Sequence, residues 1–129
     1  MANRSKKTSK TIGVGITQVH FTFFPNGSSD PVAADIIDPG YTVASVTYAS
    51  GIYTVTLKDT WSRLVSKSVS YQNQAANVDM YAQFGVIDLA AKTVAIQMKT
   101  GATNTAPAAA NANHSVSCTL TFQESLVTR

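Results

Sequence analysis

The sequence is poor in charge, in glutamate and in cysteine. Only 13% of its 129 residues are charged, about half of the ~25% that is usual in globular domains. Apolar residues make up 44% of the chain, which is too many for a disordered chain of low hydrophobicity. We therefore expect one folded domain, since a chain of this length supplies one ordinary core.

Long apolar runs are also missing. No stretch approaches the ~20 apolar residues that span a bilayer. The first ten residues, MANRSKKTSK, lead into no apolar signal segment. We expect a soluble protein without a secretory signal and without membrane contact.

The single cysteine, Cys118, excludes an internal disulfide. Its alternating context, S-V-S-C-T-L-T-F, places it on one strand face with Val116, Leu120 and Phe122. We predict a buried thiol that packs as a small apolar side chain.

The residues that are abundant favour strands over helices. Val, Ile and Thr number 13, 7 and 16, against 5 Leu and one Glu. β-Branched residues prefer strands, and long helices need the opposite mixture. The composition therefore predicts an all-β domain.

Alternating polar and apolar residues locate the strands. They are predicted at 18–24, 79–87, 93–99 and 115–123. The runs YTVASVTYA and IYTVTLKD flank Ser50-Gly51 and predict a hairpin in which Gly51 adopts a positive φ. Residues 59–70 fit either one helical turn, capped by Asp59 or Thr60, or a continuing strand. We expect the helical turn, followed by a strand near 66–72. Seven or eight antiparallel strands spaced about ten residues apart predict a β-sandwich or jelly roll.

Basic charge is concentrated at the N-terminus. The net charge is +3, but residues 11–129 carry six basic and seven acidic side chains. We therefore expect a flexible basic arm over residues 1–11 and a nearly neutral sandwich domain over 12–129. The arm is a candidate partner-binding segment, either for an acidic surface or only as a solubilising terminus, through Arg4, Lys6, Lys7 and Lys10.

Residues 101–114, GATNTAPAAANANH, form the second candidate contact segment. A loop of this length is uncommon in a compact domain unless it has a function, although an insertion at a loop tip is the alternative. Small uncharged side chains allow another surface to approach closely. The candidate contact residues are Thr103, Asn104, Pro107, Asn111 and Asn113.

The sequence contains no recognisable catalytic or cofactor-binding pattern. It lacks a G-x-S-x-G nucleophile motif, and Gly13-Val14-Gly15 lacks the third glycine of a dinucleotide site. The two histidines, His20 and His114, lie far apart in sequence and form no zinc-ligand spacing. We predict a non-enzymatic protein without a cofactor or metal, in which His20 is a half-buried structural residue.

Two further hypotheses concern ligands: a calcium ion held by aspartates and a sugar stacked on aromatic side chains. Asp30, Asp35 and Asp38 lie in one loop, but their spacing matches no calcium loop. A sugar-stacking platform is the other hypothesis, and its candidate residues are Tyr41, Tyr48, Tyr53, Trp61, Tyr71 and Tyr81. The sequence does not choose between a platform and half-buried strand positions.

Two segments carry a resemblance to a known class of protein. They are F-T-F-F-P-N-G-S-S-D-P at 21–31 and V-A-S-V-T-Y-A-S-G-I-Y-T-V-T-L-K-D at 43–59. With the low charge and the short basic N-terminus, the chain resembles the small β-sandwich decoration, or cement, proteins of bacteriophage capsids. This resemblance implies a protein that binds the outer surface of the capsid, commonly as a homotrimer, with the major capsid protein as partner. No site residue transfers, because no binding motif matches position by position.

Three interpretations of function follow. The first is the virion protein just described, made in the host cytoplasm and located on the capsid surface. The second is a small viral coat protein whose arm contacts packaged nucleic acid, a contact that salt would weaken steeply. The third is a carbohydrate- or receptor-binding module. Deleting residues 1–10 is expected to leave the fold intact and to weaken partner binding.

Overall fold

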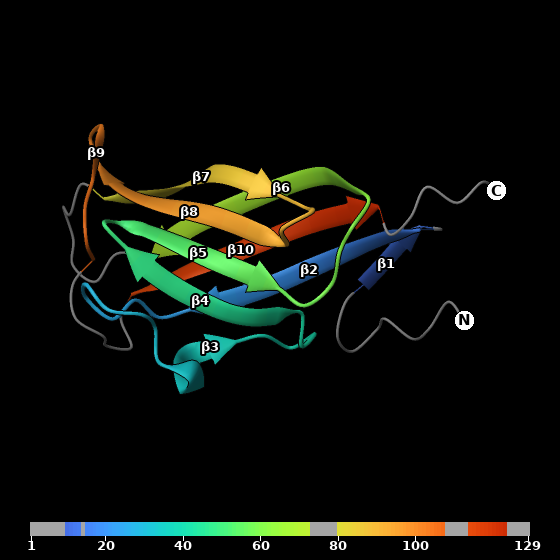
Figure 1. The fold of residues 1–129 in the computed structure, drawn as a ribbon, viewed down its shortest axis with the longest axis horizontal. Coiled ribbons are helices and arrows are strands. Elements are labelled where there is room, and N and C mark those ends of the chain that lie inside the picture. Colours follow the sequence, from blue (N-terminus) through green and yellow to red (C-terminus); the bar gives the residue numbers. More distant parts are fainter. Residues whose placement is uncertain (1–9, 14, 73–79, 108–113, 124–129) are drawn as a thin grey trace.

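The protein is an antiparallel β-sandwich, as the sequence predicted. The computed structural model describes residues 10–13, 15–72, 80–107 and 114–123. Two five-stranded sheets lie face to face (Figure 1). Among the described residues, eight strands have four residues or more, which agrees with the expected number. No helix in this part of the chain is long and apolar enough to cross a bilayer.

The first sheet has the strand order β1-β2-β10-β6. Its strands are β1 (Lys10–Gly13), β2 (Ile16–Phe23), β10 (Ser115–Gln123) and β6 (Arg63–Gln72). The two-residue strand β3 (Ile36–Ile37) pairs with the end of β2 and follows a short 3-10 helix, η1 (Ala33–Asp35). β10 therefore lies at the centre, between β2 and β6.

The second sheet has the strand order β4-β5-β8-β7. Its strands are β4 (Val43–Ala49), β5 (Ile52–Leu57), β8 (Thr93–Thr100) and β7 (Tyr81–Asp88). The short strand β9 (Thr103–Asn104) pairs with the end of β8. In Figure 1, β3 and β4 follow one long margin of the sandwich, and β6 and β7 follow the opposite margin.

The core lies between the sheets and follows directly from the period-two alternation of the strands. β2 and β10 each bury every second side chain, and β5 and β8 do the same from the other sheet. Cys118 is buried beside Val116 and Leu120, so the predicted position of the thiol is confirmed. Each fully buried side chain of valine, leucine or phenylalanine size contributes roughly 1.5–3 kcal/mol to folding.

The predicted hairpin joins β4 to β5. Both turn residues have positive φ, 49° at Ser50 and 81° at Gly51, as in the two-residue turns that match the twist of a hairpin. Gly51 is also packed tightly, because a Cβ at this position would lie 2.9 Å from Asn104 Cβ. The residue therefore needs both the φ freedom and the small size of glycine.

The helical turn predicted near residue 60 is wrong. The only element that follows β5 and precedes residue 73 in the described chain is β6, which begins at Arg63 instead of near 66. Trp61 stacks on Phe122 with ring centroids 5.0 Å apart and an interplanar angle of 7°. This ring contact joins residues far apart in sequence, so local capping signals could not reveal it.

The four longer edge strands of the described chain each carry a β-bulge. The register shifts leave one extra residue on β1, β4, β6 and β7, and none on the neighbouring inner strands. The extra residues of β4 and β6 are Ala44 and Val65. Bulges twist an edge away from the flat geometry that another strand needs for pairing. The sheets are thereby protected against edge-to-edge extension.

Candidate functional site

One outer surface of the sandwich is built mostly from hydroxyl side chains. Because β2, β10 and β6 lie side by side, the residues between their buried positions all project from the same face of the first sheet. We call the uncharged polar part of this surface the hydroxyl face. Its residues are Gln18, His20, Thr22, Ser66, Ser68, Ser70, Gln72, Ser115, Ser117, Thr119 and Thr121. At one end, the same side of the sheet continues to Ile16, Gln123 and Arg63.

Cross-strand hydrogen bonds order the hydroxyl face. His20 Nδ1 and Thr119 Oγ1 share a hydrogen bond of 3.0 Å, and the hydroxyls of Thr22 and Ser117 share one of 3.1 Å. His20 is exposed, so the half-buried position expected for it is wrong: its ring lies on the outer face, bonded to a neighbouring strand. None of these eleven side chains is charged, and the same side of the sheet carries Arg63 at one end, where it pairs in register with Gln123.

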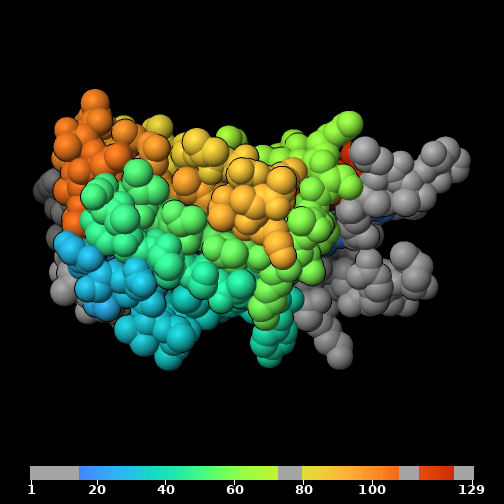
Figure 2. All heavy atoms as spheres, viewed as in Figure 1, coloured from blue at the N-terminus to red at the C-terminus, as the bar shows by residue number. Residues whose placement is uncertain are grey.

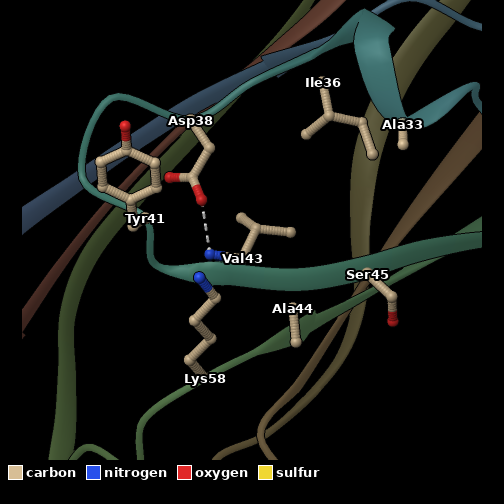
Figure 3. A pocket seen from close by; sticks show the side chains of 8 residues that line it. All are labelled: Ala33, Ile36, Asp38, Tyr41, Val43, Ala44, Ser45 and Lys58. Atoms are coloured by element: carbon tan, nitrogen blue, oxygen red, sulfur yellow. Dashed lines mark hydrogen bonds between the residues drawn. The ribbon is translucent and has the colours of Figure 1, made fainter.

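An open pocket of about 250 Å³ lies beside β4, where the two sheets diverge at their β3 and β4 margins (Figure 3). Its lining combines apolar side chains with a carboxylate, a hydroxyl and an ammonium group. The lining residues are Ala33, Ile36, Asp38, Tyr41, Val43, Ala44, Ser45 and Lys58. Tyr41 is 74% exposed and has a φ of 54°, a conformation that non-glycine residues seldom adopt. Lys58 Nζ lies 5.7 Å from the centroid of the Tyr41 ring.

The three aspartates of the 30–38 loop do not act as one ligand set. Asp30 Oδ1 accepts a hydrogen bond from the backbone N–H of Tyr48. Asp38 accepts one from the N–H of Val43 at 2.8 Å and another from the hydroxyl of Thr42 at 3.0 Å. Within the described ranges, no group of three His, Cys, Asp or Glu side chains is placed to hold a metal ion. Asp30 and Asp38 instead hold the backbone of β4.

The predicted contact loop is only partly exposed. Thr103 and Asn104 are exposed and form β9. Pro107 is buried, so its assignment as an exposed contact residue is wrong: the chain after β9 turns inward, and Thr105 N donates to Met98 O at 2.8 Å. Asn111 and Asn113 lie outside the described residues.

The predicted basic arm lies mostly outside the described residues. Arg4, Lys6 and Lys7 belong to the undescribed segment 1–9. The backbone of Lys10 begins β1, where it pairs with Gln18 of β2. Strand β1 therefore starts within the segment that was predicted as arm, and the role of the four cations stays a prediction.

The aromatic side chains do not assemble into one platform. Tyr53 is fully buried, with ring centroids 4.8 Å from Phe23 and 5.1 Å from Tyr48. Trp61 packs on Phe122, and Tyr71 shares a 3.0 Å hydrogen bond with Nδ1 of the buried His114. Of the six candidates, Tyr41 and Tyr81 are the two exposed side chains. Tyr41 precedes β4 and Tyr81 begins β7, and these two strands lie on different margins of the sandwich.

Burial is the main cause of the raised pKa values of Cys118 and Tyr53. It raises the pKa of the Cys118 thiol to about 12, so the thiolate that a nucleophile requires is suppressed. It also raises the pKa of Tyr53 well above the ordinary value, with smaller contributions from Tyr48 and Tyr71. Both shifts stabilise the neutral form, and neither activates a side chain for chemistry.

Comparisons with known proteins place the chain in no family. No protein-family model, no curated protein and no solved structure matches it. The function is therefore argued from the surfaces themselves.

The hydroxyl face was not predicted from the sequence. The signal was present as two alternating runs, S-K-S-V-S at 66–70 and S-V-S-C-T-L-T at 115–121. Each run fixes which residues share a side of its own strand, but only the pairing of β6 with β10 brings the two rows together.

Proposed function

We propose that the protein is a non-enzymatic viral structural protein: a capsid decoration, or cement, protein that binds the outer capsid surface and stabilises the shell as an oligomer. The hydroxyl face is the observation that carries this proposal. It presents eleven uncharged side chains from three adjacent strands, which is a surface for contact rather than a cleft for chemistry. This is the same class of protein that the segments 21–31 and 43–59 resemble.

A surface of this kind suits binding to a repeating protein lattice. Serine and threonine hydroxyls both donate and accept hydrogen bonds, so they can pair with backbone or side-chain groups of a partner without burying a charge. Each contact contributes modestly, because every hydrogen bond formed replaces one to water. Several linked copies on identical sites then gain avidity, so weak contacts can still give firm attachment.

The proposed partner is the major capsid protein, and the proposed location is the exterior of the virion after synthesis in the host cytoplasm. The charge of the body supports a protein partner over nucleic acid. Where the structure describes the side chains, five acidic groups balance five basic ones. A surface that neutralises phosphates needs an excess of Lys and Arg.

Co-sedimentation with genome-free shells of the capsid protein from the same genome tests the proposal. The double variant Ser68→Glu/Ser70→Glu places two carboxylates on exposed positions of β6. It is expected to lose shell binding while its circular dichroism stays unchanged. The control Thr47→Glu adds a charge to an exposed position of β4 in the other sheet and is expected to bind normally.

Two results would overturn the proposal. One is a wild-type protein that fails to sediment with the shells. The other is a double variant that folds and binds as the wild type does, which would remove the hydroxyl face as the docking surface.

A further inference from the structure

Exposed apolar side chains gather on two opposite margins of the sandwich. The six large exposed apolar residues of the described chain have between 41% and 77% of their surface exposed. Three lie in the segment 32–41 beside β3 and β4, and three lie on β6 and β7: Val32, Ile37 and Tyr41, then Val65, Tyr81 and Val86. Groups of exposed apolar residues mark interaction surfaces.

These two margins also carry opposite charge. Asp30, Asp35 and Asp38 belong to the loop and short elements beside β4. Arg63 and Lys67 belong to β6, and Lys67 Nζ lies 5.2 Å from the centroid of the Phe84 ring on β7. Figure 2 shows the cyan segment near residue 35 on one margin of the molecule and the yellow segment near residue 85 towards the other. We call these margins the acidic edge and the basic edge.

The remaining described charges do not erase this separation. Lys58 lines the pocket at the acidic edge, which leaves three aspartates against one lysine there. Asp88 ends β7 on the basic margin, where Arg63 and Lys67 outnumber it. Lys99 pairs in register with Tyr81 of β7 and adds to the basic side. The body is therefore neutral as a whole and polarised from one edge to the other.

The acidic edge is hollowed by a pocket, and the basic edge carries an exposed apolar side chain. The acidic edge holds the 250 Å³ pocket, with Ile36 and Val43 in its lining and the Asp38 carboxylate beside them. The basic edge offers Val65, which the β-bulge leaves without a cross-strand partner and 53% exposed. Val65 lies between Arg63 and Lys67 in the sequence. Val65 is thus an exposed apolar side chain between two cations on one edge, and the other edge holds a pocket whose lining includes the apolar Ile36 and Val43, the Asp38 carboxylate and the Lys58 ammonium group.

We infer that the acidic edge of one copy docks on the basic edge of a second copy, in a head-to-tail contact that builds the homo-oligomer. The contact is made by side chains, because bulges on β4, β6 and β7 oppose strand-to-strand pairing at these edges. A head-to-tail contact produces a ring when its rotation closes. This inference deepens the proposed function, which requires an oligomer, but self-association is measured without any capsid.

A contact between two identical edges is disfavoured by the same charges. Two acidic edges would bring aspartates together, and two basic edges would bring Arg63 and Lys67 against their own copies. Like charges brought together at an interface weaken binding, whereas opposite charges guide partners together. The charge pattern therefore selects the head-to-tail arrangement over a symmetric dimer.

Charge reversal at each edge tests the inference by analytical ultracentrifugation. Arg63→Glu/Lys67→Glu makes both edges acidic, and Val32→Lys/Asp35→Lys makes the opposite edge basic without touching the hydrogen bonds of Asp30 or Asp38. Each variant alone is expected to dissociate, with the dissociation constant of self-association raised at least about tenfold. An equimolar mixture is expected to reassociate, since each variant then meets an edge of opposite charge.

The masses of the mixture give a second, sharper readout. In a mixed assembly the two variants must alternate, because each binds only the other. A closed ring therefore contains an even number of chains, and a closed trimer cannot form. Ser68→Glu/Ser70→Glu is the matched control, because it adds two carboxylates to the same strand on the hydroxyl face and is expected to associate as the wild type does.

Several outcomes would overturn the head-to-tail contact: a monomeric wild type, charge-reversed variants that associate normally, or variants that dissociate and are not restored by mixing. These outcomes are distinguishable from failure of the proposed function. A chain that self-associates as described but does not sediment with shells refutes capsid binding alone.

Discussion

The Asp30 carboxylate accepts a hydrogen bond of 2.7 Å from the backbone N–H of Tyr48, 18 residues further along the chain. At the other end of β4, Asp38 does the same for the N–H of Val43. β4 is an edge strand with β5 as its partner, so its outward N–H groups have no strand to bond. Two aspartates satisfy donors that would otherwise attract another strand.

The Asp38 carboxylate is expected to contribute more to stability than a surface carboxylate. Asp38→Ala removes two hydrogen bonds to a charged acceptor, and bonds of this type contribute roughly 1.5–3 kcal/mol. We predict a loss of about 2 kcal/mol in the free energy of unfolding, measured by urea titration. Asp35→Ala is the control and is expected to change stability by less than about 0.5 kcal/mol. Equal effects of the two substitutions would contradict the edge-holding role.

The buried hydroxyl of Tyr53 has no hydrogen-bond partner within the described structure. A buried polar group without a partner costs free energy. Tyr53→Phe is therefore expected to leave stability unchanged or to raise it by about 1 kcal/mol. Tyr48→Phe removes the acceptor of the Gly51 N–H, a bond of 2.8 Å, and is expected to lower stability by about 1 kcal/mol. Thermal unfolding of both variants, compared under one condition, checks the opposite signs.

Burial of Cys118 makes stability depend on pH in the alkaline range. Its folded-state pKa is about 12, against about 8.5 in an unfolded chain. Below the unfolded value both states keep the proton. Above it the unfolded chain releases a proton that the folded chain retains, so stability falls as the pH rises through this window. From about pH 8 to about pH 10 the predicted loss is about 2 kcal/mol.

The variant Cys118→Ala isolates this effect. It is expected to be less stable at neutral pH because of the cavity it leaves, but to show a smaller decline at alkaline pH. Urea titrations at the two pH values give the difference. An identical decline in both proteins would show that the thiol is not the responsible group.

Gly51 is expected to tolerate substitution poorly. Alanine there would require a φ of 81° and would place its Cβ 2.9 Å from both Asn104 Cβ and Thr105 N. Gly101 is the matched control, since its φ is 61° and a Cβ would meet nothing within 4 Å. Backbone strain of this kind costs on the order of 1–2 kcal/mol, so Gly101→Ala should lose about that much. Gly51→Ala should lose clearly more, as measured by thermal unfolding.

Deleting residues 1–9 tests the basic arm. The deletion removes Arg4, Lys6 and Lys7 but keeps β1, which starts at Lys10. The fold is expected to survive, as judged by circular dichroism, while sedimentation with capsid shells weakens. The opposite result, full shell binding by the shortened chain, would exclude the arm from the contact.

The sequence by itself determined the strands and their inward faces. Alternation is a local property: neighbouring side chains of an extended chain point to opposite sides, so β10 and the burial of Cys118 follow from a few consecutive residues. The β4–β5 hairpin follows in the same way, because Gly51 meets the φ requirement of a two-residue turn.

Tertiary structure decided everything that depends on which segments become neighbours. Trp61 stacks on Phe122, which lies on a strand far along the chain. Pro107 is buried although its own segment is polar and small. The hydroxyl face and the two charged edges also exist only after strand order is set, because they combine residues up to about a hundred positions apart. Pairing between distant strands is selected by the free energy of the whole core, and no local pattern encodes it.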